Sequence, residues 1–431
     1  MTKSNRTGLA VFIVFSLVVF GAWASGSTES STQAGTQMVK LNFWDMVWGP
    51  APQYQTTSQG LVAAFNKAHP GIEVTYQSIP WSNWYQTYLT AIASGTAPDA
   101  STGAGYQAFQ FGQMGAILPI DDVIEKWTKS GEINEFYPGS VEAMKYNGHY
   151  YALPWEIDIR VLYYNKSLFK AANLTPPKTW PELRADAKAL TGNGVYGMVM
   201  PGDTLGEHNF FFFMYDNGGG MFTPDGKPDF LNPRNMEAAT FIADLVKDGS
   251  LDPAGAGFQS ADSQKVFTEQ KAAMYLANPG KENLFGQTAS QIGLVPLPTG
   301  PHGTKGTVYW FNNMMLYSQT KHPAEDKTFL EWYSQNSLPL FTDGGVNGFP
   351  VRKAFLSNSY FTSNADLNFI MNDYLPNGKT SSYPDPHLFP QLNTVEGQGF
   401  LQALVQQLIQ GKDPVQAMQQ ANTQFLSIMN Q

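Results

Sequence analysis

The sequence contains no cysteine, and only 14% of its 431 residues are charged. The absence of cysteine excludes disulfide bonds, thiolate metal sites and cysteine nucleophiles. The formal net charge is −9, which argues against nucleic acid or an anionic membrane surface as the main partner. The aromatic content of 14% is, by contrast, too high for a disordered chain. A chain of 431 residues is long enough for two or three structural units.

The sequence motifs of several enzyme classes are also missing. The chain contains no G-x-x-x-x-G-K-[ST], H-E-x-x-H or G-x-S-x-G motif. Gly192–Gly197 matches G-x-G-x-x-G, but a helical stretch precedes it and a strand-like stretch follows, which indicates a turn. The six histidines are isolated and lack metal-ligand spacing. We therefore expect no cofactor and no metal.

The first 24 residues have the layout of a secretory signal peptide. An apolar run from Leu9 to Trp23 follows two basic residues and precedes an A-x-A cleavage pattern that ends at Ala24. An uncleaved anchor is the alternative, but the run is shorter than the ~20 residues that span a bilayer. We expect cleavage after Ala24, a flexible polar leader over residues 25–37, and a periplasmic or extracellular mature protein.

Strand and helix patterns alternate along the mature chain and predict an α/β fold. Apolar residues alternate over Val39–Phe43, follow helical spacing over Leu61–Ala68, and alternate again over Ile72–Tyr76. This β-α-β order predicts a parallel pair of strands with a right-handed crossover. A further helix is predicted at Trp84–Ser94, N-caps at Thr179, Asn232 and Asp413, and strands at residues 196–200, 272–276 and 292–296.

Two carboxylates lie two residues apart in an extended segment. Glu156 and Asp158 would project from one face of a strand. A glycosidase needs two carboxylates about 5–10 Å apart, so a secreted carbohydrate-active enzyme that uses Glu156, Asp158 or Asp45 is one hypothesis. The same pair suits hydrogen bonding to a polar ligand at least as well.

Aromatic residues gather in stretches rich in glycine, proline and asparagine, often beside an Asp, Asn or Arg. Each of them alone fits a core position, but together they favour a carbohydrate ligand. A sugar ring has an apolar face and a rim of hydroxyl groups, which match aromatic faces and planar polar groups. The residues concerned are Trp44, Trp48, Trp81, Trp84, Tyr106, Trp155, Trp310 and Phe349.

Seven segments carry a family resemblance through their joint order and spacing. They are Leu41–Asp45, Phe65–Val74, Ala91–Asp99, Gly115–Asp122, Tyr151–Pro154, Leu162–Phe169 and Pro176–Leu183. In this order the chain resembles, over residues 39–428, the extracellular solute-binding proteins of bacterial ABC sugar importers, the maltose-binding-protein-like group. The chain departs from many relatives at Ala277–Gly280, which lacks a tryptophan.

The resemblance implies a type II periplasmic-binding-protein fold with two α/β lobes and a hinge between them. The implied N-lobe comprises residues 38–155 and 314–348, and the implied C-lobe comprises residues 156–313 and 349–431. A mono- or oligosaccharide would bind in the cleft by hinge closure, without any chemical step, and a monomer would deliver it to an ABC permease. A recognition protein that serves a sensor or chemoreceptor is a further hypothesis.

The resemblance also implies ligand contacts at particular positions, to which the aromatic pattern adds three tryptophans. We expect Asp99 to have a structural role, and Trp81 to serve either as a ligand platform or in packing. The expected ligand-binding residues are Asp45, Trp48, Trp81, Thr102, Tyr106, Trp155, Asp158, His208, Asn209, Trp310, Asn312 and Arg352.

Overall fold

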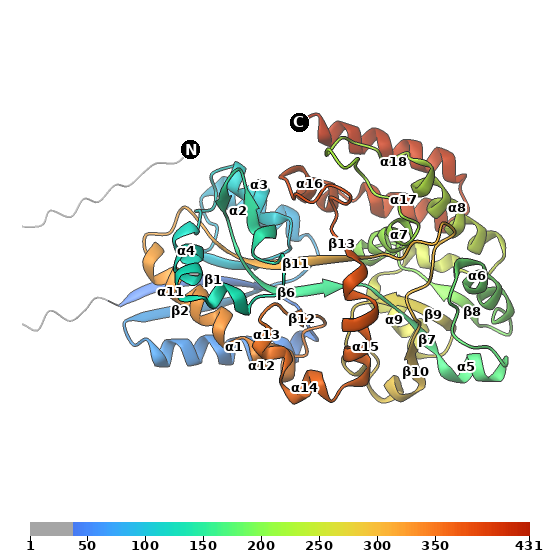
Figure 1. The fold of residues 1–431 in the computed structure, drawn as a ribbon, viewed down its shortest axis with the longest axis horizontal. Coiled ribbons are helices and arrows are strands. Elements are labelled where there is room, and N and C mark those ends of the chain that lie inside the picture. The colour runs from blue at the N-terminus through green and yellow to red at the C-terminus, as the bar shows by residue number, and fades with distance from the viewer. Residues whose placement is uncertain (1–37) are drawn as a thin grey trace, which may run out of the picture. The chain divides into compact units, whose positions relative to one another are not determined.

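The structure is a computed structural model that describes residues Met38–Gln431. The predicted signal peptide and polar leader lie outside the described residues. From Met38 onward, strands and helices alternate and build two main sheets, which form the cores of two lobes (Figure 1). The predicted α/β class is therefore confirmed. Between Met38 and Gln431, no helix combines the length and apolarity that crossing a membrane requires.

The larger sheet has the strand order β12-β6-β11-β3-β1-β2, with β13 paired to β11. Its strands are β1 (Val39–Met46), β2 (Ile72–Ile79), β3 (Ala100–Gly103), β6 (Leu153–Ile159), β11 (Thr307–Leu316), β12 (Phe349–Pro350) and β13 (Gly378–Lys379). β1 pairs in parallel with β2 and β3, whereas β11 runs antiparallel to β3 and β6. Because α1 connects β1 to β2, the predicted β-α-β unit is confirmed.

The smaller sheet has the strand order β10-β7-β9-β8. Its strands are β7 (Val161–Asn165), β8 (Tyr196–Val199), β9 (Ala272–Ala277) and β10 (Ile292–Leu294). β8 is parallel to β9, and β7 is antiparallel to both β9 and β10. Three of these strands occupy the segments predicted at residues 196–200, 272–276 and 292–296. A separate hairpin joins β4 (Lys145–Tyr146) to β5 (His149–Tyr150).

Helices cover the sheets and connect their strands. In chain order, the α-helices are α1 (Ala51–Ala68), α2 (Trp84–Ser94), α3 (Gln107–Gln113), α4 (Asp121–Ser130), α5 (Lys166–Ala171), α6 (Trp180–Ala189), α7 (Thr204–Asp216), α8 (Pro233–Lys247), α9 (Ser260–Thr268), α10 (Lys281–Phe285), α11 (Pro323–Asn336), α12 (Leu338–Thr342), α13 (Lys353–Leu356), α14 (Ser359–Thr362), α15 (Ala365–Asp373), α16 (Gln391–Gly397), α17 (Phe400–Ile409) and α18 (Pro414–Met429). Short 3-10 helices occur at η1 (Glu132–Glu135), η2 (Glu142–Met144), η3 (Pro253–Gly257), η4 (Gly286–Gln291) and η5 (Leu375–Asn377).

The predicted local signals agree with the observed helix ends. Thr179, Asn232 and Asp413 each accept a hydrogen bond from a backbone N–H in the first turn of the helix that follows. The Gly192–Gly197 segment makes a tight turn, in which the N–H of Gly192 donates to the carbonyl of Val195 and the reverse bond also forms, both at 2.9 Å. It therefore has no phosphate-binding geometry, because a nucleotide loop opens a helix rather than a strand.

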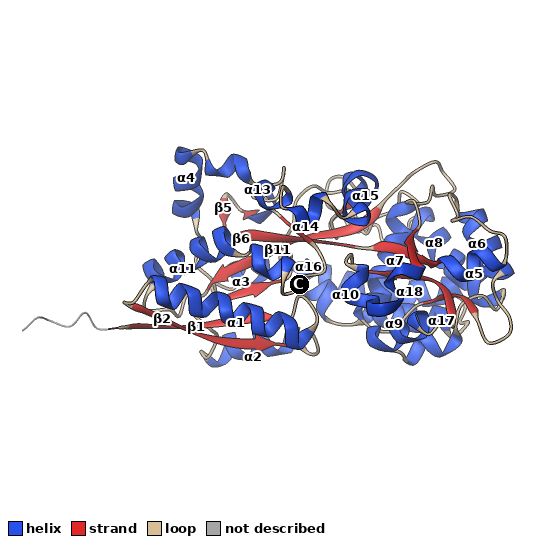
Figure 2. Ribbon diagram, turned by 90° about the horizontal axis from the view of Figure 1, so that it is seen from below, coloured by secondary structure: helices blue, strands red, loops and turns tan. Residues whose placement is uncertain are grey.

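Two strands link the sheets. β6 lies in the larger sheet and continues through Arg160 into β7 of the smaller sheet. β11 begins beside Arg160, whose carbonyl oxygen accepts a hydrogen bond from the Thr307 hydroxyl at 2.7 Å, and then runs back into the larger sheet. Figures 1 and 2 show β6 and β11 extending between the two groups of strands.

α7 is the most deeply buried helix next to these strands. Every residue from Leu205 to Asp216 is buried, including the run Phe210–Tyr215. A helix that is apolar around its circumference is stable only inside the protein. The helix packs against β11, α8 and α17 and is capped by Asp203, whose carboxylate accepts the N–H of Leu205 at 3.0 Å. Its first two turns are thereby held rigidly at the junction of the sheets.

Asp216, at the end of α7, supplies a test of this packing. Its carboxylate accepts hydrogen bonds from Trp180 Nε1 at 2.6 Å and from the N–H of Gly306 at 3.1 Å. Burial raises its pKa from 3.8 to about 7. The folded protein therefore holds a proton that the unfolded chain releases, and this carboxyl costs stability progressively as the pH rises from about 4 to about 7.

We predict that Asp216→Asn removes this part of the pH dependence. Relative to wild type, the free energy of unfolding of the variant should rise with pH, by at most about 4 kcal/mol between pH 4 and pH 7. Urea unfolding at three pH values measures the difference. The exposed Asp343→Asn serves as a matched control and should run parallel to wild type. Parallel curves for Asp216→Asn as well would contradict the prediction.

Candidate functional site

A cavity of about 750 Å³ lies where the two sheets meet. β6 and β11 supply residues in its centre. The loops after β1 and β3 and the start of α2 line one side, and the N-terminal ends of α7 and α9 with the end of β9 line the other. This volume is in the range of about 300–1,000 Å³ that is typical of small-molecule sites.

Aromatic rings make up much of the side formed by the larger sheet. Trp48 meets Trp81 edge to face with ring centroids 4.9 Å apart, and Trp84 lies 5.9 Å from Tyr106. Trp81 is 37% exposed, and its Nε1–H donates to the carbonyl of Val47 at 2.7 Å. Its indole is thus fixed at one edge while much of the ring stays accessible, which suits a flat ligand surface.

Trp310 on β11 is held by contacts on three sides. Its Nε1–H lies 3.2 Å from both the Ser381 hydroxyl and Glu396 Oε1. The Arg160 guanidinium lies 4.9 Å from its ring, and the His208 ring lies 4.3 Å away. The indole therefore has a single orientation toward the cavity.

An ion pair at the strand crossing connects the two sides of the cavity. Arg160 Nη1 lies 2.5 Å from Asp158 Oδ1, and Asn278 Nδ2 donates to the same oxygen at 2.8 Å. Arg160 Nη2 donates to His208 Nδ1 at 2.7 Å. One buried guanidinium thus orients a carboxylate from β6 and an imidazole from α7.

Glu156 and Asn312 form a second polar pair, across β6 and β11. Asn312 Nδ2 donates to Glu156 Oε2 at 2.5 Å, and Asn312 Oδ1 accepts the N–H of Gly105 at 3.1 Å. Burial, and then the nearby Asp158 carboxylate, raise the pKa of Glu156 well above 4.5. A protonated Glu156 can offer a hydrogen-bond donor as well as an acceptor.

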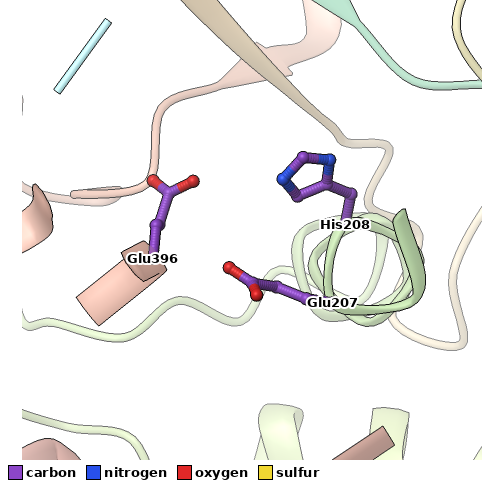
Figure 3. Close-up of side chains that lie close together, drawn as sticks. All are labelled: Glu207, His208 and Glu396. Carbon is purple, nitrogen blue, oxygen red and sulfur yellow. The ribbon is translucent and has the colours of Figure 1, made fainter. Parts of the chain in front are cut away.

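A third polar group comprises Glu207 and His208 on α7 and Glu396 on α16, which point toward one another (Figure 3). Their potential ligand atoms all lie within 4.8 Å of one another. Burial raises the pKa of Glu207, and it raises that of Glu396 to about 8. Burial, followed by the charge of Arg160, lowers the pKa of His208 well below 6.5. At neutral pH the imidazole is therefore uncharged.

Seven of the twelve residues expected to bind ligand line this cavity. They are Trp48, Trp81, Tyr106, Asp158, His208, Trp310 and Asn312. The other five do not line it. They are Asp45, Thr102, Trp155, Asn209 and Arg352.

Asp45 and Thr102, two of the expected ligand contacts, do not line the cavity and belong to a buried network behind its wall. The Asp45 carboxylate accepts hydrogen bonds from the hydroxyl groups of Tyr54, Ser58 and Thr102. Thr102 Oγ1 in turn accepts Trp48 Nε1–H at 3.0 Å. Burial raises the pKa of Asp45 to about 6. These two residues position Trp48 rather than face the cavity.

Trp155 and Asn209 are buried beside residues that line the cavity but do not line it themselves. Trp155 is buried behind Trp48, with ring centroids 5.3 Å apart, because it alternates with Glu156 on β6. Asn209 follows His208 on α7, so its side chain is rotated by about 100° and faces the carbonyl of Leu276 at 3.5 Å.

Arg352 lies away from the cavity in a buried ion-pair cluster. Its guanidinium contacts Glu132 at 2.7 Å and Glu135 at 3.2 Å, and its Nε donates to the Ser334 hydroxyl at 3.0 Å. It also lies 4.6 Å from the ring of Phe136. These contacts hold η1 and α11 against the loop after β12.

Several residues that line the cavity were not among the expected ligand-binding residues. Arg160 could have been found, because it follows Glu156 and Asp158 at the same period of two along the extended segment. The others come from separate helices, or from residues next to them, and carry no motif of their own. Examples are Asp203, Gln259, Ser260, Gln264, Glu396, Gln398, Gln402 and Gln406.

A two-lobed fold with a polar and aromatic cavity at the junction of its sheets defines a small-molecule binding protein. A family model described as bacterial extracellular solute-binding protein matches residues 49–337, about two thirds of the chain. The chain belongs to this family. Proteins of this family are extracellular and bind a solute for transport without acting as enzymes, so the alternative of a carbohydrate-active enzyme is not supported.

Individual relatives give the same classification. A sugar transporter structure from Arthrobacter chlorophenolicus, with bound laminaribiose, is 34% identical, covers 90% of this chain and 99% of that one, and has a TM-score of 0.86. A binding protein of Brucella abortus is 29% identical over 70% of this chain and 74% of its own length. A sn-glycerol-3-phosphate-binding periplasmic protein of Brucella melitensis is 29% identical over 52% of this chain and 55% of its own length.

The network behind Trp48 leads to a prediction about Thr102. Thr102→Val removes the acceptor of Trp48 Nε1–H and of the Met46 N–H, which donates to Thr102 Oγ1 at 2.9 Å. Buried donors left unpaired cost about 1–3 kcal/mol each, so we expect a loss of about 2–4 kcal/mol in the free energy of unfolding. Urea unfolding followed by tryptophan fluorescence measures this loss.

The control for this experiment is Thr87→Val on α2. The Thr87 hydroxyl donates to the backbone carbonyl of Asn83 at an exposed position, so its loss should change stability by less than about 0.5 kcal/mol. Equal effects of the two substitutions would show that the Asp45–Thr102 network does not stabilise the wall of the cavity.

Proposed function

We propose that this protein binds a sugar, a mono- or oligosaccharide, and delivers it unchanged to an ABC importer. The observation that carries the proposal is the pairing of aromatic faces with planar polar groups in one cavity. Trp81 and Trp310 offer ring surfaces, and Asp158 and Asn312 offer hydrogen-bonding groups beside them. A pyranose ring has both an apolar C–H face and a rim of hydroxyl groups, so it can use both. The laminaribiose in the 34% identical relative supports a carbohydrate ligand.

We place the direct ligand contacts on the seven expected residues that line the cavity, namely Trp48, Trp81, Tyr106, Asp158, His208, Trp310 and Asn312. The other expected residues would act indirectly or in stability. Binding would select a closed arrangement of two lobes, because a ligand shifts an equilibrium only by its differential affinity for the two states.

The expected lobes are residues 38–155 with 314–348, and 156–313 with 349–431. The β6–β7 crossing at Arg160 supports a hinge near residue 160, because there the chain passes from one sheet to the other. We further propose that the protein is exported by its N-terminal signal, acts as a monomer in the periplasm or outside the cell, and docks transiently on the permease in its closed form.

A thermal-shift screen of the mature protein against sugars, polyols and glycerophosphodiesters tests the proposal. A ligand that binds only the folded state raises the melting temperature by mass action. We expect at least one sugar, with laminaribiose as the first probe, to raise the melting temperature and change tryptophan fluorescence without forming a product. Stabilisation by no sugar, or the appearance of new reducing ends, would overturn the proposed function.

We predict that Asp158→Ala weakens binding of that sugar by about 1–3 kcal/mol, because a charged hydrogen-bond acceptor is lost from the cavity. Isothermal titration calorimetry measures the change. The matched control is Glu125→Ala on α4, a carboxylate whose side chain is 65% exposed and paired to Lys129, and it should leave affinity unchanged. Unchanged affinity in Asp158→Ala would remove this residue from the site.

We predict that Arg352→Met lowers the stability of the protein but leaves its affinity for the sugar unchanged. We expect the free energy of unfolding to fall by about 1–3 kcal/mol, since Glu132 and Glu135 lose a buried partner. The dissociation constant of the sugar should stay within about twofold of wild type, because Arg352 lies outside the cavity. If the variant folds but binds the sugar more than about tenfold more weakly, Arg352 belongs to the ligand site after all.

A further inference from the structure

The side chains of Glu207, His208 and Glu396 each leave one buried polar atom without a protein partner. These atoms are Glu207 Oε1, His208 Nε2 and Glu396 Oε2, and none of them hydrogen bonds to another described group. Glu207 is fully buried, Glu396 is 1% exposed, and His208 is 8% exposed. Unpaired buried polar atoms are rare in proteins because each one costs about 1–3 kcal/mol. Three of them within one small group therefore indicate that something else binds there.

The hydrogen-bonding roles of these atoms follow from Arg160. A guanidinium can only donate, so His208 Nδ1 accepts the hydrogen bond from Arg160 Nη2 at 2.7 Å. The imidazole is uncharged, and its single proton therefore resides on Nε2. His208 Nε2 thus points a donor into the group. Burial favours the protonated carboxyl groups, so Glu207 Oε1 and Glu396 Oε2 can each either carry the acid proton and donate it or accept a hydrogen bond.

These roles do not suit a metal ion or a cation. A metal needs a lone pair on Nε2, which the proton occupies while Arg160 holds Nδ1. An ammonium group could donate to Glu207 and Glu396 but would leave His208 Nε2–H without an acceptor. An anion could accept from His208 Nε2–H, but Arg160, the one cationic side chain among the described lining residues, is already paired with Asp158. A hydroxyl group both accepts and donates, and two adjacent hydroxyl groups can satisfy all three atoms.

We propose that Glu207, His208 and Glu396 form a subsite that binds two adjacent hydroxyl groups of an uncharged sugar, an inference that rests on the proposed function. One hydroxyl group accepts from His208 Nε2–H and also hydrogen bonds with Glu396 Oε2, as acceptor when that carboxyl is protonated and as donor when it is ionised. Its neighbour would hydrogen bond with Glu207 Oε1, which is fully buried and lies beside the lining residues His208 and Glu396. Glu396 and His208 also flank Trp310, so the hydroxyl pair is anchored where the ring face of the sugar meets the indole.

The charges around the cavity agree with an uncharged ligand. Arg160 is the one lysine or arginine among the described residues that line it, and its charge is already paired with Asp158, although its Nε–H has no partner. Four acidic residues line the same cavity, namely Glu156, Asp158, Asp203 and Glu396. Burial favours the protonated, neutral form of Glu396, which adds no charge at neutral pH. A phosphate would therefore be buried without a free counterion.

The N-terminus of α7, which is a potential anion site, is also occupied. Asp203 accepts the N–H of Leu205, and its other oxygen accepts both the N–H and the hydroxyl of Ser260. The carboxylate thus satisfies the positive end of the helix dipole itself. This chain should accordingly reject sn-glycerol 3-phosphate, the ligand named for one relative of 29% identity.

Isothermal titration of the mature protein with laminaribiose and its monodeoxy derivatives tests the subsite. We expect loss of either of two adjacent hydroxyl groups to weaken binding to wild type by about tenfold to a hundredfold. In His208→Ala and Glu396→Ala, the parent sugar should bind about tenfold or more weakly, and the same deoxy sugars should lose little further affinity. His208→Gln, which retains an N–H donor, should recover part of the loss.

Matched controls separate this subsite from general effects on the fold. His322→Ala and Glu125→Gln alter side chains outside the cavity and should bind laminaribiose and its deoxy derivatives like wild type. sn-Glycerol 3-phosphate, glucosamine and ZnCl2, each tested alone by thermal shift and titration, should give no binding to wild type.

The outcomes distinguish this inference from the proposed function. If no sugar of the screen binds to wild type, both fail. If laminaribiose or another sugar binds but Glu396→Ala and His208→Ala leave its affinity unchanged, or if no deoxy position couples to these residues, only the subsite is overturned. Saturable binding of sn-glycerol 3-phosphate or glucosamine overturns the uncharged ligand class. Zinc binding that Glu396→Gln abolishes replaces the subsite with a metal site.

Discussion

The buried Arg160 guanidinium is the interaction on which the rest of the structure depends. It lies at the residue where β6 leaves the larger sheet and β7 enters the smaller one, and only 4% of it is exposed. The guanidinium forms an ion pair with Asp158 at 2.5 Å and donates a hydrogen bond to His208. It also lies 4.9 Å from the ring of Trp310. Removing one partner of such a buried pair costs about 3–5 kcal/mol, because the other is left uncompensated. One side chain therefore couples the path of the chain to the geometry of the cavity.

The polar side chains of the cavity can be buried because the elements that carry them are held in place by strong apolar packing elsewhere. α7 is buried along its length, and its Phe210–Tyr215 segment fixes the helix in the core. That packing offsets the cost of burying Glu207 and His208 in the preceding turn of the helix, where polar atoms lack protein partners. Side chains held in one orientation lose little conformational entropy when a ligand binds. The entropy of ordering them has already been lost during folding.

Most of the fold could be predicted from local patterns, while the site could be predicted only in part. The alternation at Val39–Phe43 and the helical spacing before Ala68 were enough to define the first β-α-β unit, because both periods depend on local geometry alone. The same period of two places Glu156, Asp158 and Arg160 on one face of the crossing segment and Trp155 on the other. Applied strictly, it would have excluded Trp155 and added Arg160.

Other parts of the site depend on contacts that no local pattern encodes. Glu396 reaches the cavity from α16, and its position depends on how the C-terminal helices pack against α7 and Trp310. Asp45 has the residue type of a sugar contact, but α1 covers its side of β1, and the hydroxyl groups of Tyr54 and Ser58 saturate its carboxylate. A carboxylate can bind a ligand only with lone pairs that the fold has not already used. Residue type therefore identifies candidates, and the neighbours contributed by tertiary packing decide which of them face the solute.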